Sequence, residues 1–180
     1  MSVQQDEASS LLRIANGFDT WQWATEVQSR LPAADFQDRL DIASAHRGAV
    51  CIYLCRVCLH LGLLCEMISP LEDLVTEVIA HLSNISTESS LFAATTWPSF
   101  IAGAETNDSA KHVWIRGRFD HIQALEPWGV IGNAASLLEK IWQKRSEDVY
   151  ETVAGYPAIV YTHNDWLDSM GEDGNDWLIL

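Results

Sequence analysis

The chain has few basic residues: 11 Lys and Arg against 25 Asp and Glu among 180 residues, which gives a net charge of -14. A surface of this sign repels phosphate backbones, so this chain itself is not expected to bind DNA or RNA. The shortage is greatest over residues 147–180, which include eight acids and no Lys or Arg. This acidic, aromatic C-terminal segment is therefore chemically separate from the rest.

Long uncharged apolar runs are also missing, because Arg47 and Arg56 interrupt the best candidate for a membrane span. The polar, acidic start MSVQQDEASS is not typical of a secretory or mitochondrial presequence. Four cysteines in such a sequence favour reduced thiols in the cytosol or nucleus. These features predict a soluble chain with no membrane partner.

The sequence has no alternating strand pattern, no glycine-rich phosphate loop and no GxSxG elbow. Its apolar residues, 48% of the total, recur instead at helical spacing. We therefore predict an all-α fold: a helical bundle of antiparallel helix pairs around a buried central helix at about residues 46–64. Residues 1–8 are expected to be disordered, and residues 9–180 to form a single helical domain.

The central helix is predicted from two stripes of side chains. One stripe is small and contains Cys51, Cys55, Cys58, Gly62 and Cys65. The other is bulky and contains Val50, Leu54, Val57, Leu61 and Leu64. Such a helix lets one neighbour approach closely while another interlocks with its aliphatic face.

The cysteine spacing has a second interpretation. Cys51-x3-Cys55-x2-Cys58 matches the spacing by which radical enzymes hold an iron–sulfur cluster. Packing is the favoured interpretation, because a cluster loop needs an irregular backbone and this segment has a continuous helical pattern. No metal or cofactor is expected.

Further helices are predicted on both sides of this segment. Gly17 ends the first, Asp19 or Thr20 caps the second, and Gly48 is a weak point where a helix from Ala33 enters the central one. Pro98 is expected near a helix break, with Trp97 extended. The predicted ranges are 11–15, 21–27, 33–64, 71–82, 110–126 and 134–145, the last two capped by residues 107–109 and Asn133.

Several polar groups raise the question of a catalytic or metal site. Asp35, Asp38 and Asp41 could hold Mg²⁺, although an acidic solvent face near a helix start is favoured because no second acidic group faces them. The pairs Glu77 with His81, His121 with Asp120, and His163 with Asp165 have no evident third member. No enzyme activity is expected. Lys111, Arg116 and Arg118 form the one concentrated basic surface, for a partner or, as favoured, for neighbouring acids.

Five segments together resemble a known family. They are LLRIANGFDTWQWA (11–24), AVCIYLCR (49–56), WPSFIAGAE (97–105), LEKIW (138–142) and DWLDSMGEDGNDWLIL (165–180). In this order they resemble the C-terminal part of the fungal-specific transcription factor domain, the helical region of fungal binuclear zinc cluster regulators. WPSFIAGAE is the most specific of them.

The resemblance implies a nuclear regulatory domain that acts in transcription through protein partners, either transcription machinery or a full-length relative, or through a small-molecule effector. It covers the later portion of the usual domain, so the chain is partial relative to the family. The six-cysteine zinc cluster by which such regulators bind DNA is absent, because Cys55 and Cys58 form the single CxxC pair of this sequence. DNA binding therefore does not carry over. A stand-alone dimerisation module that titrates a relative is the alternative function, and a small helical enzyme is a remoter one.

The acidic end suggests how partners bind. Acidic residues surround hydrophobic anchors there, as in activation segments that dock into a coactivator groove. The competing interpretation is a terminal helix that docks on the bundle, capped by Asp165 and stopped by Gly171. The predicted partner-binding residues are Trp166, Leu167, Met170, Trp177 and Leu178.

Overall fold

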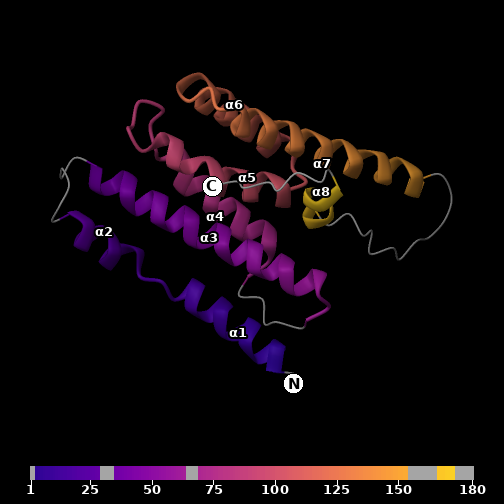
Figure 1. Ribbon diagram of the computed structural model, residues 1–180, viewed down its shortest axis with the longest axis horizontal. Coiled ribbons are helices and arrows are strands. Elements are labelled where there is room, and N and C mark those ends of the chain that lie inside the picture. The colour runs from indigo at the N-terminus through magenta and orange to yellow at the C-terminus, as the bar shows by residue number, and fades with distance from the viewer. Residues whose placement is uncertain (1–2, 29–34, 64–68, 154–165, 173–180) are drawn as a thin grey trace.

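The protein is a bundle of helices (Figure 1). The computed structural model describes residues 3–28, 35–63, 69–153 and 166–172, and every regular element in these ranges is helical, which confirms the all-α prediction. The elements are α1 (Val3–Asn16), α2 (Thr20–Gln28), α3 (Phe36–His60), α4 (Leu71–Ser83), the 3-10 turn η2 (Phe92–Thr95), α5 (Thr96–Glu105), α6 (Ser109–Leu125), α7 (Gly129–Val153) and α8 (Trp166–Glu172).

Helix α3 lies at the centre of the arrangement (Figure 1). Helices α1 and α2 cover one side of it, and α4 and α5 pack against the other. Helices α6 and α7 form an outer layer over α5, while the short α8 contacts α7 and α3. The predicted central helix is thus confirmed as the element that joins the two halves of the bundle.

Two pairs of helices that follow one another in the chain, α3 with α4 and α6 with α7, run antiparallel, as predicted. Gly48 of α3 lies against Val78 of α4, whereas the earlier Asp41 binds His81, nearer the end of α4. The same reversal relates α6 to α7, because Arg116 pairs with Glu139 while the ring of His112 stacks on Trp142. Short connections between amphipathic helices favour this arrangement.

The prediction that a helix from Ala33 continues into the central helix is confirmed, because α3 is one helix from Phe36 to His60. It ends before the predicted residue 64. Gly62 follows with φ +67, a left-handed conformation that suits glycine at a helix end, and the Leu63 amide bonds to the Cys58 carbonyl oxygen. Gly48 does not interrupt the helix.

The small stripe of α3 is more deeply buried than its bulky stripe. Cys51, Cys55 and Cys58 are buried, and so is the Ala45 and Ala49 face beside them. The bulky stripe is less covered: Val50, Leu54 and Val57 are half-buried and Leu61 is exposed. Small residues occupy the centre because α3 packs tightly against α4 there; a Cβ on Gly48 would lie 2.6 Å from Val78 Cγ2. Cys65 and Leu64 lie outside the described residues.

The three cysteines of α3 are free thiols within a regular helix. Burial raises the pKa of Cys51, which favours the thiol over the metal-binding thiolate. Among the described residues, no group of three or more His, Cys, Asp or Glu could hold a metal ion. The structure therefore supports the packing interpretation of the Cys-x3-Cys-x2-Cys spacing.

Replacing Cys55 with alanine is expected to lower the free energy of unfolding by about 1 kcal/mol, because the fully buried sulfur would leave a small cavity. Chemical denaturation measures the loss, and elemental analysis of the purified variant should give the same zinc content as the wild-type protein. A fall in zinc stoichiometry would contradict the packing role.

Other boundaries also shift. The sequence predicts disorder over residues 1–8, whereas α1 begins at Val3, in a stretch of good helix formers. Helix α7 begins at Gly129 rather than after Asn133 and extends to Val153. Pro98 lies in the first turn of α5, where proline is tolerated, so Trp97 is helical and not extended. The expected break lies instead at the 3-10 turn η2, directly before α5.

Helix α3 is also, among the described residues, the one helix long and apolar enough to cross a membrane. The central helix of a bundle meets the same criterion, and α3 contacts five other α-helices. Its length and composition therefore follow from its place in the core, and they carry no argument for a membrane span.

Candidate functional site at the end of helix α5

The segment WPSFIAGAE forms most of α5, and its residues from Pro98 to Glu105 are all buried. Gly103 permits a close approach, because a Cβ there would lie 3.1 Å from Ile115 and 3.2 Å from Leu138. The carbonyl oxygen of Gly103 also accepts a hydrogen bond of 2.8 Å from the indole of Trp142. Helix α5 is thus held in close contact with α6 and α7, and its last residue carries a charge into the interior.

That residue, Glu105, binds two other helices through its carboxylate. Arg56 of α3 donates to both oxygens, from Nε at 2.6 Å and from Nη2 at 2.5 Å. The indole nitrogen of Trp166 in α8 donates to Oε2 at 3.1 Å. Glu105 is 6% exposed, so these donors compensate for the cost of burying its charge. One carboxylate therefore joins α3, α5 and α8.

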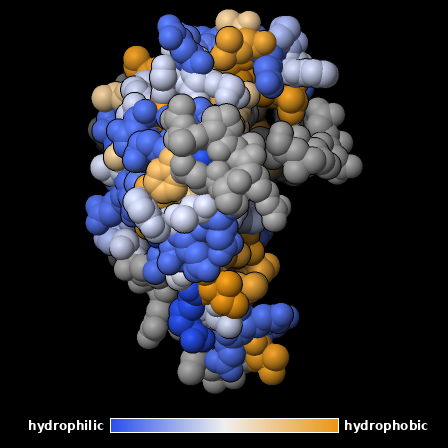
Figure 2. All heavy atoms as spheres, turned by 90° about the vertical axis from the view of Figure 1, so that its left-hand side faces the viewer, coloured by the Kyte–Doolittle hydropathy of each residue, from blue (hydrophilic) through white to orange (hydrophobic). Residues whose placement is uncertain are grey.

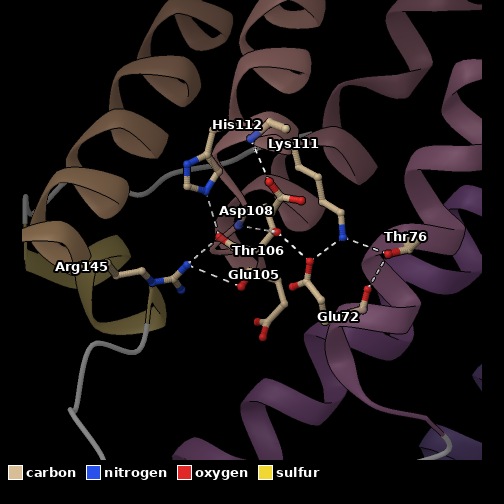
Figure 3. Close-up of polar contacts among 9 residues, drawn as sticks. Glu72, Thr76, Glu105, Thr106, Asp108, Lys111, His112 and Arg145 are labelled. Carbon is tan, nitrogen blue, oxygen red and sulfur yellow. Dashed lines mark hydrogen bonds and ion pairs between the residues drawn. The ribbon is translucent and has the colours of Figure 1, made fainter. Parts of the chain in front are cut away.

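The backbone at this end of α5 is held from the opposite side (Figure 3). Arg145 of α7 donates to the carbonyl oxygens of Glu105 and Thr106, and His112 shares a hydrogen bond of 3.0 Å with the Thr106 oxygen. Figure 3 shows the Glu105 side chain pointing away from this network. Arg145 thus compensates for carbonyl oxygens at the C-terminal end of α5, which have no partner within that helix.

A polar cluster extends the network toward α4 (Figure 3). Glu72 accepts from Thr106 Oγ1 at 2.9 Å and pairs with Lys111, whose ammonium also donates to Thr76. Asp108 caps α6 by accepting from the Ala110 amide, as predicted for the residues before this helix. Glu72 is paired with Lys111, and Asp108 is held at the start of α6, so the cluster joins α4 to the end of α5 and the start of α6.

The predicted partner-binding residues fall into three groups. Trp166 is fully buried beside Tyr53 and Phe100, with ring centroids 6.2 and 6.4 Å away. Leu167 and Met170 are half-buried against the core. Trp177 and Leu178 lie outside the described residues, as does the proposed cap Asp165. Helix α8 continues through Gly171, its predicted stop, to Glu172. Trp166 is thus docked on the bundle, as the competing interpretation predicted. Partner binding by these residues stays a prediction.

The three aspartates at the start of α3 do not converge on a metal. Asp35 lies 4.0 Å from Arg39, Asp38 accepts from Ser89, and Asp41 accepts from Gln37, His81 and Asn84. The favoured interpretation, an acidic solvent face, is wrong for Asp41, which is 3% exposed. Its carboxylate joins α3 to the end of α4 through partners about forty residues away, a distance that sequence periodicity cannot reveal.

Asp41 makes stability depend on pH. Burial raises the pKa of Asp41, but the hydrogen bonds from Gln37, His81 and Asn84 outweigh burial and lower the pKa below its ordinary value of 3.8. The unfolded chain therefore binds this proton first, and the stability due to Asp41 is lost as the pH falls below about 4.

We expect Asp41→Asn to cost about 1 kcal/mol at pH 7, since charge-assisted hydrogen bonds become neutral ones. The difference from wild type should shrink at pH 3, where wild-type Asp41 also loses its advantage. Urea denaturation at both pH values measures it, and an equal difference at both would refute the role assigned to this carboxylate.

The three residues of the predicted basic surface do not form one basic surface in the fold. Lys111 pairs with Glu72, and Arg116 pairs with Asp120 and Glu139, which confirms pairing with neighbouring acids for these two. Arg118 is instead buried, with its guanidinium 4.4 Å from the centre of the Phe92 ring. Burial lowers the pKa of Arg118 to about 10.

The predicted acid and base pairs that fall within the described residues bind other groups in the structure. His121 bonds to the carbonyl oxygen of Gly117 in its own helix, and Asp120 is held by Arg116. His81 contacts Asp41 at 2.7 Å rather than forming the predicted pair with Glu77, which is 4.0 Å away. His163 lies outside the described residues. These groups bind structural partners, and none is placed beside a nucleophile.

The contact of Arg56 and Trp166 with Glu105 was not predicted from the sequence, although two isolated charges in the sequence point to part of it. Arg56 interrupts the apolar surface of α3, and Glu105 ends an otherwise apolar α5. Isolated opposite charges in two strongly apolar helices are expected to pair, because an unpaired charge in such surroundings is costly.

Comparison with known proteins agrees with the resemblance. The sequence model of the family described as "Fungal specific transcription factor domain" matches residues 2–180. The acriflavine sensitivity control protein acr-2 of Neurospora crassa is 30% identical over 175 residues, which cover 95% of this chain and 26% of that protein. The chain thus spans about a quarter of that relative's length. No solved structure matches the chain significantly.

The family match covers nearly the whole chain and includes WPSFIAGAE, the segment that ends at the buried Glu105. The chain belongs to the fungal-specific transcription factor domain family.

Proposed function

We propose that this chain regulates transcription in the nucleus by binding other proteins, and that it neither catalyses a reaction nor contacts DNA directly. Family membership supports the regulatory role, and the net charge of -14 opposes contact with phosphates. The relative acr-2 is named for control of sensitivity to a small molecule, which fits a further partner class, a small-molecule effector.

The observation that carries the proposal is how the acidic C-terminal segment meets the bundle. One side chain of α8, Trp166, is fully buried, whereas Leu167 and Met170 are only partly covered. The pair between Asp168 and His60 is 3.7 Å long and more than a third exposed on both sides. Most contacts of this helix are thus weak, and a partner whose groove buries Trp166 equally well could displace the helix from the bundle.

The proposed partner surface therefore consists of Trp166, Leu167, Met170, Trp177 and Leu178. Docking on the bundle and binding to the partner compete for Trp166, because a side chain buried beside Phe100 cannot enter a second groove. Loosening the bundle side should then increase partner binding, and removing tail anchors should decrease it.

A reporter assay tests this competition. The whole chain is fused to a heterologous DNA-binding domain, and transcription is recorded for three variants. Leu167→Ser with Met170→Ser should reduce activation several-fold, and Tyr53→Ala, which removes a ring beside Trp166, should increase it. Leu125→Ser is the control, because Leu125 is exposed at the end of α6 and should leave activation unchanged.

The tail variant and the Tyr53 variant both weaken docking of α8 on the bundle. If they change activation in opposite directions, the change therefore reflects partner binding and not loss of stability. A silent wild-type fusion, or equal activation by the wild type and the tail variant, would overturn the proposal. The fusion also reports residence in the nucleus if it is made fluorescent without an added import signal.

A dimerisation module is the second candidate, and a specific surface favours it. Figure 2 shows hydrophobic residues exposed among hydrophilic ones at the lower end of the molecule, where α1 lies in Figure 1. Leu11 and Ile14 of α1 and Trp21 of α2 are at least half exposed. Light scattering across a concentration series tests self-association or pairing with a relative, and a monomer that binds no relative would exclude it.

A further inference from the structure

A concave apolar pocket lies between α1, α2 and α3. Its volume is about 480 Å³, within the range of sites that bury small molecules. Phe18 in the α1–α2 connection and Trp23 of α2 provide aromatic walls, and Ile42 and Ala43 of α3 provide an aliphatic wall. The dimensions and walls suit a compact ligand with ring systems, because aromatic walls contact flat apolar groups over a large area.

The polar residues of the pocket already bind protein groups. Arg47 Nη2 lies 3.1 Å from the Glu77 carboxylate, so its charge is neutralised by α4. His46 stacks on Trp97, with 5.6 Å between the ring centroids, and its Nε2 lies 3.0 Å from the Ala94 carbonyl oxygen. A negatively charged ligand would have to compete with Glu77 for the Arg47 guanidinium, and most of the other lining residues are apolar, so they offer a charged group no partner in exchange for its hydration.

We propose that this pocket binds an uncharged, apolar, ring-containing small molecule. The pocket walls come from both sides of the interface between α3 and the layer of α1 and α2, so the ligand bridges that interface. A molecule that binds there and not to the unfolded chain stabilises the attachment of this layer by mass action. The inference rests on the effector binding included in the proposed function, and it adds the site and the ligand chemistry.

A matched pair of fluorescent probes tests the ligand chemistry. N-phenyl-1-naphthylamine is uncharged, whereas 1-anilinonaphthalene-8-sulfonate adds a negative charge to nearly the same ring skeleton. The whole wild-type chain should bind the uncharged probe saturably with one site and bind the sulfonate at least tenfold more weakly. Equal or tighter binding of the sulfonate would overturn the uncharged class.

Two substitutions test the location. Ala43→Phe fills the pocket from α3 and should weaken binding of the uncharged probe at least tenfold. Phe18→Ala removes an aromatic wall that is nearly half exposed, so this variant should fold, and it should weaken binding at least threefold. Circular dichroism and thermal melting show that each variant is folded; if Ala43→Phe does not fold, Phe18→Ala decides.

A second apolar groove provides the control. Leu61 lines a groove of about 340 Å³ between α1 and the end of α3, and Leu61→Ser should leave probe affinity unchanged. Loss of binding in Leu61→Ser, unchanged affinity in Phe18→Ala, or no saturable binding would overturn the assignment. A dimer that buries the pocket would exclude the probe and would overturn it too. The assay includes no transcriptional readout, so its failure is distinct from failure of the reporter test.

Discussion

Replacing Arg56 with methionine is expected to lower the free energy of unfolding by about 3 to 5 kcal/mol, the cost of leaving a buried charge without its partner. Glu105 is 6% exposed and would retain one donor, the Trp166 indole. Methionine keeps most of the volume of the arginine stem, so the loss reports the charge pair more than packing. Urea denaturation of the whole chain measures it.

The partner substitution should reverse most of this loss. In Arg56→Met with Glu105→Gln the buried group is neutral, and its amide oxygen can still accept from Trp166. Arg116→Met is the matched control, because its partners Asp120 and Glu139 are exposed and the expected cost is about 0.5 kcal/mol. Equal costs at Arg56 and Arg116 would contradict the central role given to the buried pair.

A single methyl group at Gly48 is expected to cost about 2 kcal/mol. The added Cβ would lie 2.6 Å from Val78 Cγ2, and a β-branched side chain inside a helix cannot rotate away cheaply. Helices α3 and α4 must therefore separate, although each is otherwise well packed. Thermal or chemical denaturation of Gly48→Ala measures the loss.

Gly117→Ala is its control, since a Cβ there meets nothing within 4 Å and alanine is a better helix former. That variant should gain about 0.5 to 1 kcal/mol. In the double variant Gly48→Ala with Val78→Ala, the new methyl fills part of the space that valine leaves, so the two costs should be less than additive. Strict additivity would show that the close approach at Gly48 has little effect on stability.

The buried pair and the proposed competition for Trp166 are connected through Glu105. Glu105 holds Trp166 on one side and Arg56 on the other, so a change in the core of the bundle alters how firmly α8 is docked. The proposed partner surface would then respond to the state of the domain, including the layer of α1 and α2 that packs against the same α3. This gives a regulatory region a physical route from its core to its acidic end.

Helical periodicity and capping residues were enough to predict most helices and the fold class. The apolar spacing of α4 predicts a helix over residues 71–82 and the structure has Leu71–Ser83, because one face of this surface helix is buried and the other is solvated. Helix ends were less predictable. Helix α3 was predicted to reach residue 64 but ends at His60, and Gly62 adopts a left-handed conformation just beyond it.

The candidate site depended on tertiary structure for a similar reason. The sequence shows Arg56 and Glu105 as isolated charges in apolar helices, and it indicates that each needs a partner. The residues that meet are 49 and 61 positions apart, and periodicity within one helix says nothing about such distances. The amino-acid order therefore specifies which surfaces must be buried, whereas helix packing selects which buried groups meet: Arg56 with Glu105, Asp41 with His81, and Trp166 with the end of α5.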